Sequence, residues 1–204
     1  MMEVTFARRA AFVALFFLAA LPATPTFAQT VVFDNGNVDS GGTLFSDPGA
    51  SQLLAEDFTF NATTTFDTVR WFGAYAFADT PTAPDAFTIS FFDTTAGIPN
   101  ATPRTDEVFA VGNSAIRVNL GPTSSGFDIY QYEATLTAPI TVVAGAYGME
   151  IVNDTTADTD DVWGWAISKK PGISFVRNAP NGEFNVNGGG VAFQLIDSTP
   201  VVVP

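Results

Sequence analysis

Residues 87–93 read FTISFFD, and this short stretch decides the fold class. Phe87, Ile89 and Phe91 fall at every second position, with a threonine and a serine between them. Successive side chains of a β-strand point to opposite faces, so the alternation predicts a strand with one buried, apolar face.

The same alternation recurs along the chain, and turn-forming residues separate the segments. The sets expected to share an inward face are Phe58 with Phe60; Ile116 with Val118 and Leu120; Tyr147 with Met149 and Ile151; and Val191 with Phe193 and Leu195. No stretch after residue 28 repeats at the helical period for three turns. The sequence therefore predicts an all-β protein, a two-sheet antiparallel β-sandwich of jelly-roll type with about 9–11 strands.

Composition excludes several classes of function. The chain has 204 residues, enough for one domain, with 21 acidic against 8 basic residues and a formal net charge of −13. Such a surface repels phosphate backbones and anionic lipid, so we expect neither nucleic acid nor, for the mature form, a membrane as partner. The absence of cysteine and histidine removes disulfides, thiolate nucleophiles and imidazole bases.

The amino terminus is typical of a secretory signal peptide. Arg8 and Arg9 precede the apolar run AAFVALFFLAAL (10–21), and small residues lead to Ala28. The run is short for a membrane span, which disfavours the alternative of an uncleaved anchor. We predict a signal peptide at 1–28, a β-sandwich domain at 29–197 and a Pro/Val tail at 198–204, in a protein that is secreted or held at the cell surface.

Three longer stretches carry a resemblance to a known group. They are LAEDFTFNATTTFDTVRWFGAY (54–75), FTISFFDTTAGIPNATP (87–103) and VNDTTADTDDVWGWAIS (152–168). Together they resemble secreted bacterial β-sandwich proteins that often carry a PEP-CTERM (exosortase) sorting tail. The tail itself is absent here, since the given sequence stops at Pro204, where the motif would begin. The resemblance implies export and a surface or matrix role, and its motifs are strand patterns rather than catalytic signatures.

An acidic loop suggests a calcium site. Asp154, Asp158, Asp160 and Asp161 crowd one short segment, and calcium favours several oxygen ligands, carboxylates among them. The spacing does not match an EF-hand loop. The alternative is an acidic turn that is solvated and binds nothing. Calcium is the one cofactor that the sequence suggests.

Aromatic residues form a second candidate site. Trp163 and Trp165 share one face of the strand that follows the acidic loop. If exposed beside Trp71 and Tyr75, they would make a stacking platform for carbohydrate. The alternative is that the indoles belong to the core, where large aromatics supply most of the buried area.

Two glutamates are the weak candidates for catalysis. Glu133 and Glu150 lie on predicted strands, and a glycosidase needs only two carboxylates about 5–10 Å apart. No motif of a glycosidase family accompanies them. We therefore expect a non-catalytic, secreted surface or extracellular-matrix module, calcium-stabilised and associated with polysaccharide. A carbohydrate-binding module and a carboxylate-dependent glycosidase are the alternatives, and the oligomeric state is open.

Overall fold

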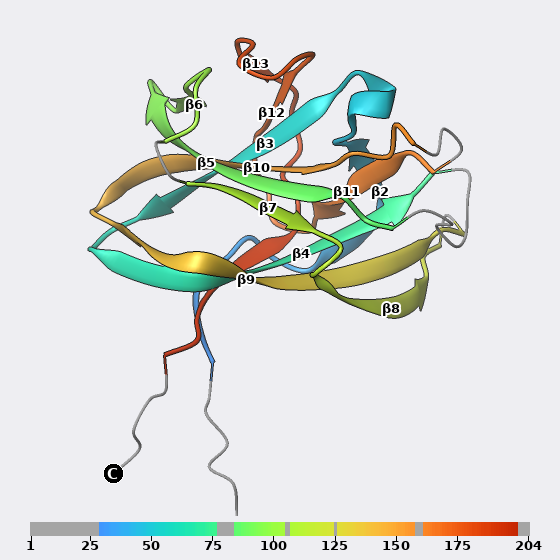
Figure 1. Ribbon diagram of the computed structural model, residues 1–204, viewed down its shortest axis with the longest axis horizontal. Coiled ribbons are helices and arrows are strands. Elements are labelled where there is room, and N and C mark those ends of the chain that lie inside the picture. The colour runs from blue at the N-terminus through green and yellow to red at the C-terminus, as the bar shows by residue number, and fades with distance from the viewer. Residues whose placement is uncertain (1–28, 77–83, 105–106, 125, 158–160, 200–204) are drawn as a thin grey trace, which may run out of the picture.

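The protein is a sandwich of two antiparallel β-sheets (Figure 1). The structure, a computed structural model, describes residues 29–76, 84–104, 107–124, 126–157 and 161–199. Each sheet has seven strands, and the one helical element among these residues is a single 3-10 turn, η1 (Pro48–Ala50). The predicted all-β two-sheet sandwich is confirmed.

The two sheets are named here after a central strand. The β4 sheet contains β1 (Thr30–Asp34), β2 (Val38–Phe45), β4 (Thr64–Tyr75), β8 (Ile116–Pro122), β9 (Asp128–Val142), β11 (Trp163–Ser168) and β14 (Phe193–Asp197). The β10 sheet contains β3 (Leu53–Phe60), β5 (Phe87–Thr95), β6 (Ile98–Pro99), β7 (Val108–Gly112), β10 (Gly145–Asn153), β12 (Ser174–Arg177) and β13 (Asn185–Val186).

The long strand β4 organises its sheet. One edge of β4 pairs with β9, and β8 lies outside β9. The other edge is shared: residues 68–71 pair with β14, which carries β1, and residues 73–75 pair with β11, which carries β2. The second sheet runs β13-β12-β3-β10-β5, with β6 and β7 beyond β5. This strand order does not establish the jelly-roll type, which stays a prediction.

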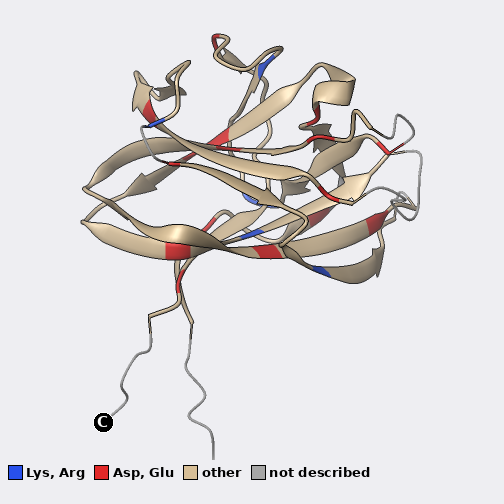
Figure 2. Ribbon diagram, in the orientation of Figure 1, with Lys and Arg blue, Asp and Glu red and all other residues tan. Residues whose placement is uncertain are grey.

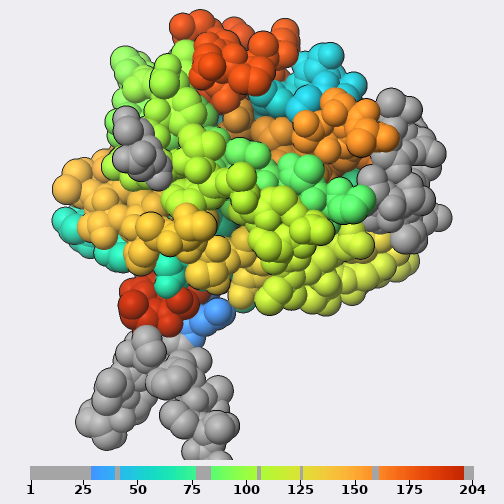
Figure 3. Space-filling view, in the orientation of Figure 1, coloured from blue at the N-terminus to red at the C-terminus, as the bar shows by residue number. Residues whose placement is uncertain are grey.

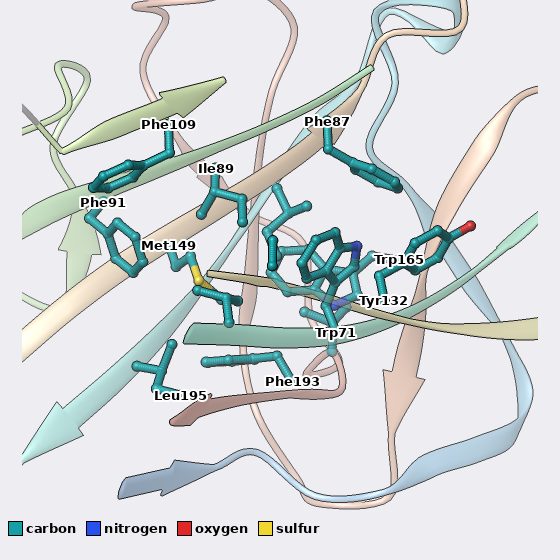
Figure 4. Packing of buried hydrophobic residues seen from close by; sticks show 14 of the residues in the cluster. Trp71, Phe87, Ile89, Phe91, Phe109, Tyr132, Met149, Trp165, Phe193 and Leu195 are labelled. Atoms are coloured by element: carbon teal, nitrogen blue, oxygen red, sulfur yellow. The ribbon is translucent and has the colours of Figure 1, made fainter. Parts of the chain in front are cut away.

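Aromatic side chains fill the space between the sheets (Figure 4). Trp71 stacks on Tyr132, with ring centroids 5.5 Å apart, and Phe87 meets both rings edge-on. Each fully buried side chain of this size contributes about 1.5–3 kcal/mol relative to an exposed one. Gly73 is needed for this packing, because a Cβ there would lie 2.5 Å from the ring of Trp163.

The alternation at sequence level identified most of this core. The inward sets on β3, β5, β10 and β14 are all buried, as predicted. The set on β8 is the exception: Ile116, Val118 and Leu120 share a face but are 67%, 46% and 53% exposed. The prediction that they face inward is wrong, because Ile116 and Val118 lie opposite Glu133 and Gln131 of β9, on the outer face of the sheet.

The β10 sheet is covered on its outer face as well. Ala55, Phe92, Phe175 and Phe184 form a small apolar cluster there, separate from the main core. Pro99 packs on the same face, where it closes over Gly148; a Cβ at that glycine would lie 2.7 Å from the proline ring. This third layer allows charged side chains to be buried on the outside of a sandwich.

The two ends of the described chain lie side by side. Thr30 on β1 pairs with Asp197 on β14, so both ends leave the β4 sheet together, on the side away from β12 and β13 (Figure 1). The predicted signal peptide (1–28) and most of the predicted tail lie outside the described residues. Among the described residues, no helix has the length and apolarity that crossing a membrane requires.

Candidate functional site

The two candidate catalytic glutamates lie in different sheets. Glu133 is on β9 and its neighbour Tyr132 faces the core, whereas Glu150 is on β10 beside the core residue Met149. Both glutamates therefore point outward, from opposite sides of the sandwich. Packed sheets lie about 10 Å apart, so the two carboxyl groups exceed the roughly 5–10 Å of a glycosidase pair. The structure does not bring the predicted pair together.

Glu133 is held by Arg70 on the neighbouring strand β4. Nη2 and Nε of Arg70 donate to Oε2 of Glu133 at 2.6 and 2.8 Å, and Nη1 donates to Oε1 of Gln194 at 2.9 Å. Asp67 and Glu56, two acids that precede Arg70 in the sequence, are not its partners. Asp67 accepts from the main-chain N–H of Ser198 at 3.0 Å, and Glu56 is on the core face of β3.

Glu150 forms a buried, bidentate ion pair with Arg177. Nε and Nη2 of Arg177 each donate to one carboxylate oxygen at 2.7 Å, and the two side chains are 4% and 5% exposed. Phe92 and Phe184 contact the guanidinium, with ring centroids 5.3 and 4.7 Å away, and Nη1 donates to the carbonyl of Ala101 at 2.9 Å. Burial raises the pKa of Glu150, an effect that Arg177 opposes.

A hollow of about 300 Å³ opens beside this ion pair. Its floor is the outer face of β3, β5, β10 and β12, and its walls are loops and the η1 turn. The lining residues are Pro48, Leu53, Ala86, Thr88, Ser90, Pro103, Val108, Glu150, Val152, Asp154, Arg177, Pro180 and Asn181. The mixture of apolar surface with hydroxyl, amide and carboxylate groups can accommodate a ligand that has both apolar and hydroxyl faces.

The acidic loop borders this hollow. Asp154 is exposed at the rim, and its Oδ1 accepts from the N–H of Thr156 at 3.1 Å and from its hydroxyl. Asp161, at the other end of the loop, is 1% exposed. Asp158 and Asp160 lie outside the described residues. No group of three potential metal ligands occurs within the described part of the chain. Calcium binding at the four aspartates stays a prediction.

The candidate aromatic platform is part of the core. Trp71, Trp163 and Trp165 are 0% exposed and Tyr75 is 3% exposed. A platform that stacks on sugar requires an exposed ring, so the ligand-binding role suggested for these residues is corrected. Trp165 donates from Nε1 to the carbonyl of Ala192 at 3.0 Å.

The Tyr75 hydroxyl belongs to a polar cluster at the rim of the core. It donates to Asp85, and Asn153 Nδ2 donates to the hydroxyl at 3.0 Å and to Asp85 at 3.1 Å. Burial is the main reason that the pKa of Tyr75 is raised. The hydroxyl is therefore engaged inside the fold rather than directed at a ligand.

Sequence reasoning did not single out Glu56, the most perturbed carboxyl described. It is 1% exposed, and its oxygens accept from Nδ2 of Asn35 at 2.9 Å and from the N–H of Val191 at 3.2 Å. Burial raises its pKa to about 8. A Cβ on Gly172 or Gly190 would come within 2.7 or 2.9 Å of Oε1, so glycines make room for the carboxyl.

Glu56 lies at a second hollow, of about 490 Å³. Phe33, Asn35 and Ile173 help to line it, between the two sheets beside β3. The sequence alternation indicates this position, because Glu56 lies two residues before Phe58 and therefore shares the inward face of its strand.

Comparison with known proteins adds no further constraint. No protein-family model, no curated protein and no solved structure matches the chain. The class that the fold defines is the all-β two-sheet sandwich, and the candidate site is defined by geometry alone.

Proposed function

We propose that this chain is a secreted, non-catalytic surface or extracellular-matrix module that associates with polysaccharide through the hollow beside Glu150 and Arg177. The observation that carries the proposal is the position of that hollow relative to the chain ends. The ends leave together from the β4 sheet (Figure 1), and the residues that line the hollow put it on the outer face of the β10 sheet. A module attached through either end would present this hollow away from its attachment.

The composition of the hollow favours a carbohydrate. Val108 and Val152 provide apolar surface for the C–H face of a sugar ring, while Thr88 and Asp154 provide groups that bond to hydroxyls. Arg177 and Glu150 already satisfy one another, so they form a rigid part of the floor of the hollow. A preorganised floor lowers the entropy lost on binding.

Charge distinguishes between kinds of polysaccharide. Acidic residues are spread over both sheets and the loops (Figure 2), in a chain of net charge −13. An anionic polysaccharide is repelled by such a surface unless a divalent cation neutralises the contact. We therefore expect binding to neutral polysaccharide without added metal, and binding to acidic polysaccharide only with calcium, for which Asp154 at the rim is suitably placed.

Binding is tested by affinity electrophoresis and calorimetry on the mature chain, with neutral and acidic extracellular polysaccharides, each with calcium and with chelator. The matched variants are Thr88→Trp, which fills the hollow, and Thr137→Trp, which adds the same ring to an exposed position on β9. We expect Thr88→Trp to abolish binding and Thr137→Trp to leave it unchanged. Equal binding by both variants, or no binding to any polysaccharide by the wild type, would contradict the proposal.

The glycosidase alternative has its own test. Glu133 and Glu150 are each occupied by an arginine and lie in separate sheets. The proposal predicts that no reducing ends appear when the wild type is incubated with the polysaccharide that it binds. Release that disappears in Glu150→Gln would establish catalysis and overturn the non-catalytic assignment.

A further inference from the structure

The strand β8 is an exposed edge. Within the described residues it pairs with β9 alone, and it forms the lower right margin of the molecule in Figures 1 and 3. A strand paired on one side directs every second N–H and C=O away from its partner, so such an edge is a template for another strand. Ile116, Val118 and Leu120 add an exposed apolar stripe along it.

The polar side chains of β8 are already engaged within the fold. Arg117 donates from Nη1 to Oδ2 of Asp85 at 3.2 Å, and its guanidinium lies 5.3 Å from the ring centroid of Tyr130. Asn119 donates from Nδ2 to Oδ2 of Asp128 at 2.7 Å. The charges along this edge are thus locally compensated, although the whole chain is strongly acidic. What β8 offers to a partner is its main chain and its apolar stripe.

We propose that β8 pairs with β8 of a second copy of this chain, antiparallel about a two-fold axis at Val118. A two-fold axis perpendicular to the sheet keeps outward side chains outward. Residues that face each other across the axis must therefore both be even-numbered or both be odd-numbered. Centred on Val118, the pairing sets Ile116 opposite Leu120 of the second copy and Arg117 opposite Asn119 of the second copy. The apolar stripe then runs unbroken across both copies.

The neighbouring registers are worse. An axis at Arg117 places two arginines directly opposite each other, which is destabilising. An axis at Asn119 sets Pro122 opposite Ile116, and proline has no N–H to give to the ladder. The side-chain pattern of β8 therefore selects one register, in which like charges do not face each other. This self-complementarity is the reason for choosing a second copy as the occupant of the edge.

The association is expected to be weak and to increase with salt. The shared surface is one strand wide, below the size of a stable dimer interface, which places Kd in the micromolar-to-millimolar range. Each copy carries a formal charge of −13, so the copies repel at long range and added salt screens that repulsion. A contact dominated by ion pairs would weaken with salt instead.

Sedimentation equilibrium of the mature chain tests the proposal. We expect concentration-dependent dimers that tighten in high salt, and we expect Val118→Lys to be monomeric because the axis brings its two ammonium groups together. Val186→Lys is the matched control, since Val186 is also an exposed valine, 62% exposed on β13, and it should dimerise as the wild type does.

Cross-linking gives a second, independent measurement. The chain contains no cysteine, so Val118→Cys introduces one thiol at the axis and should form a covalent dimer on mild oxidation, unlike Val186→Cys. A wild type that stays monomeric at millimolar concentration in high salt would overturn the proposal. So would a dimer that Val118→Lys leaves intact.

Discussion

Raising the pH is expected to destabilise the protein through Glu56. Its carboxyl is buried, and its two hydrogen-bond donors, the side chain of Asn35 and the N–H of Val191, are both neutral. Burial raises its pKa from 4.5 to about 8, because a carboxylate removed from water is disfavoured relative to the neutral acid. In the unfolded chain the same group is solvated and titrates near 4.5.

The two pKa values set the magnitude and the sign. Between them the folded state holds a proton that the unfolded state has released, so stability is fully present below the unfolded value and falls as pH rises toward about 8. A displacement from 4.5 to about 8 corresponds to about 5 kcal/mol, at about 1.36 kcal/mol for each unit. About 4 kcal/mol of this is lost between roughly pH 5 and pH 9, against a typical total stability of about 5–15 kcal/mol.

Urea unfolding of the wild type and of Glu56→Gln across this pH range measures the effect. The glutamine does not titrate, so the free energy of unfolding of the variant should depend less on pH by about 4 kcal/mol. The amide NH₂ of the glutamine must face the donor of either Asn35 or Val191, which destabilises the variant at every pH. The comparison therefore uses the change of stability with pH and not its absolute value. Glu107 and Glu150, whose pKa values are also raised by burial, are present in both proteins. Parallel pH profiles of wild type and variant would refute the reasoning.

Three further predictions concern the site, the core and the amino terminus. Arg177→Met should destabilise the protein by about 3–5 kcal/mol in urea unfolding, because it leaves the Glu150 carboxyl buried without its partner. Arg70→Met breaks a more exposed ion pair and should destabilise the protein by about 1 kcal/mol or less. Equal losses of stability in the two variants would contradict the burial of the Glu150–Arg177 pair. Gly73→Ala should lose about 1–3 kcal/mol by overpacking against the Trp163 ring, and an unchanged midpoint would show that the packing is looser. Mass spectrometry of the exported protein should give a chain that begins at residue 29, whereas an intact first methionine would refute cleavage.

Strand alternation predicted the core because burial between two sheets requires apolar side chains at every second position. It succeeded for Phe87, Ile89 and Phe91, which are all buried. It failed for Ile116, since alternation identifies which side chains share a face but not whether another layer covers that face. On β8 the apolar residues share the outer face of the sheet with Glu133 of β9, and the core face carries Arg117 and Asn119.

The candidate site was less accessible from sequence, because ion pairs depend on cross-strand register. Nothing local to Glu150 indicates Arg177, which lies on a strand two positions away in the sheet. Nothing local to Arg70 indicates Glu133 either, because the two residues are 63 positions apart and meet only through the pairing of β4 with β9. The burial of Glu56 could have been predicted, since the alternation with Phe58 alone places it on the inward face of β3.

The three tryptophans belong to the core, and the proposed function therefore puts the ligand elsewhere on the molecule. Acrylamide quenching of tryptophan fluorescence, with and without bound polysaccharide, tests it most directly. Because Trp71, Trp163 and Trp165 are 0% exposed, the folded protein should be quenched far less than the unfolded chain, and polysaccharide should not change the quenching. Strong quenching of the folded protein that polysaccharide suppresses would place an indole at the binding surface and contradict the proposed structure and function together.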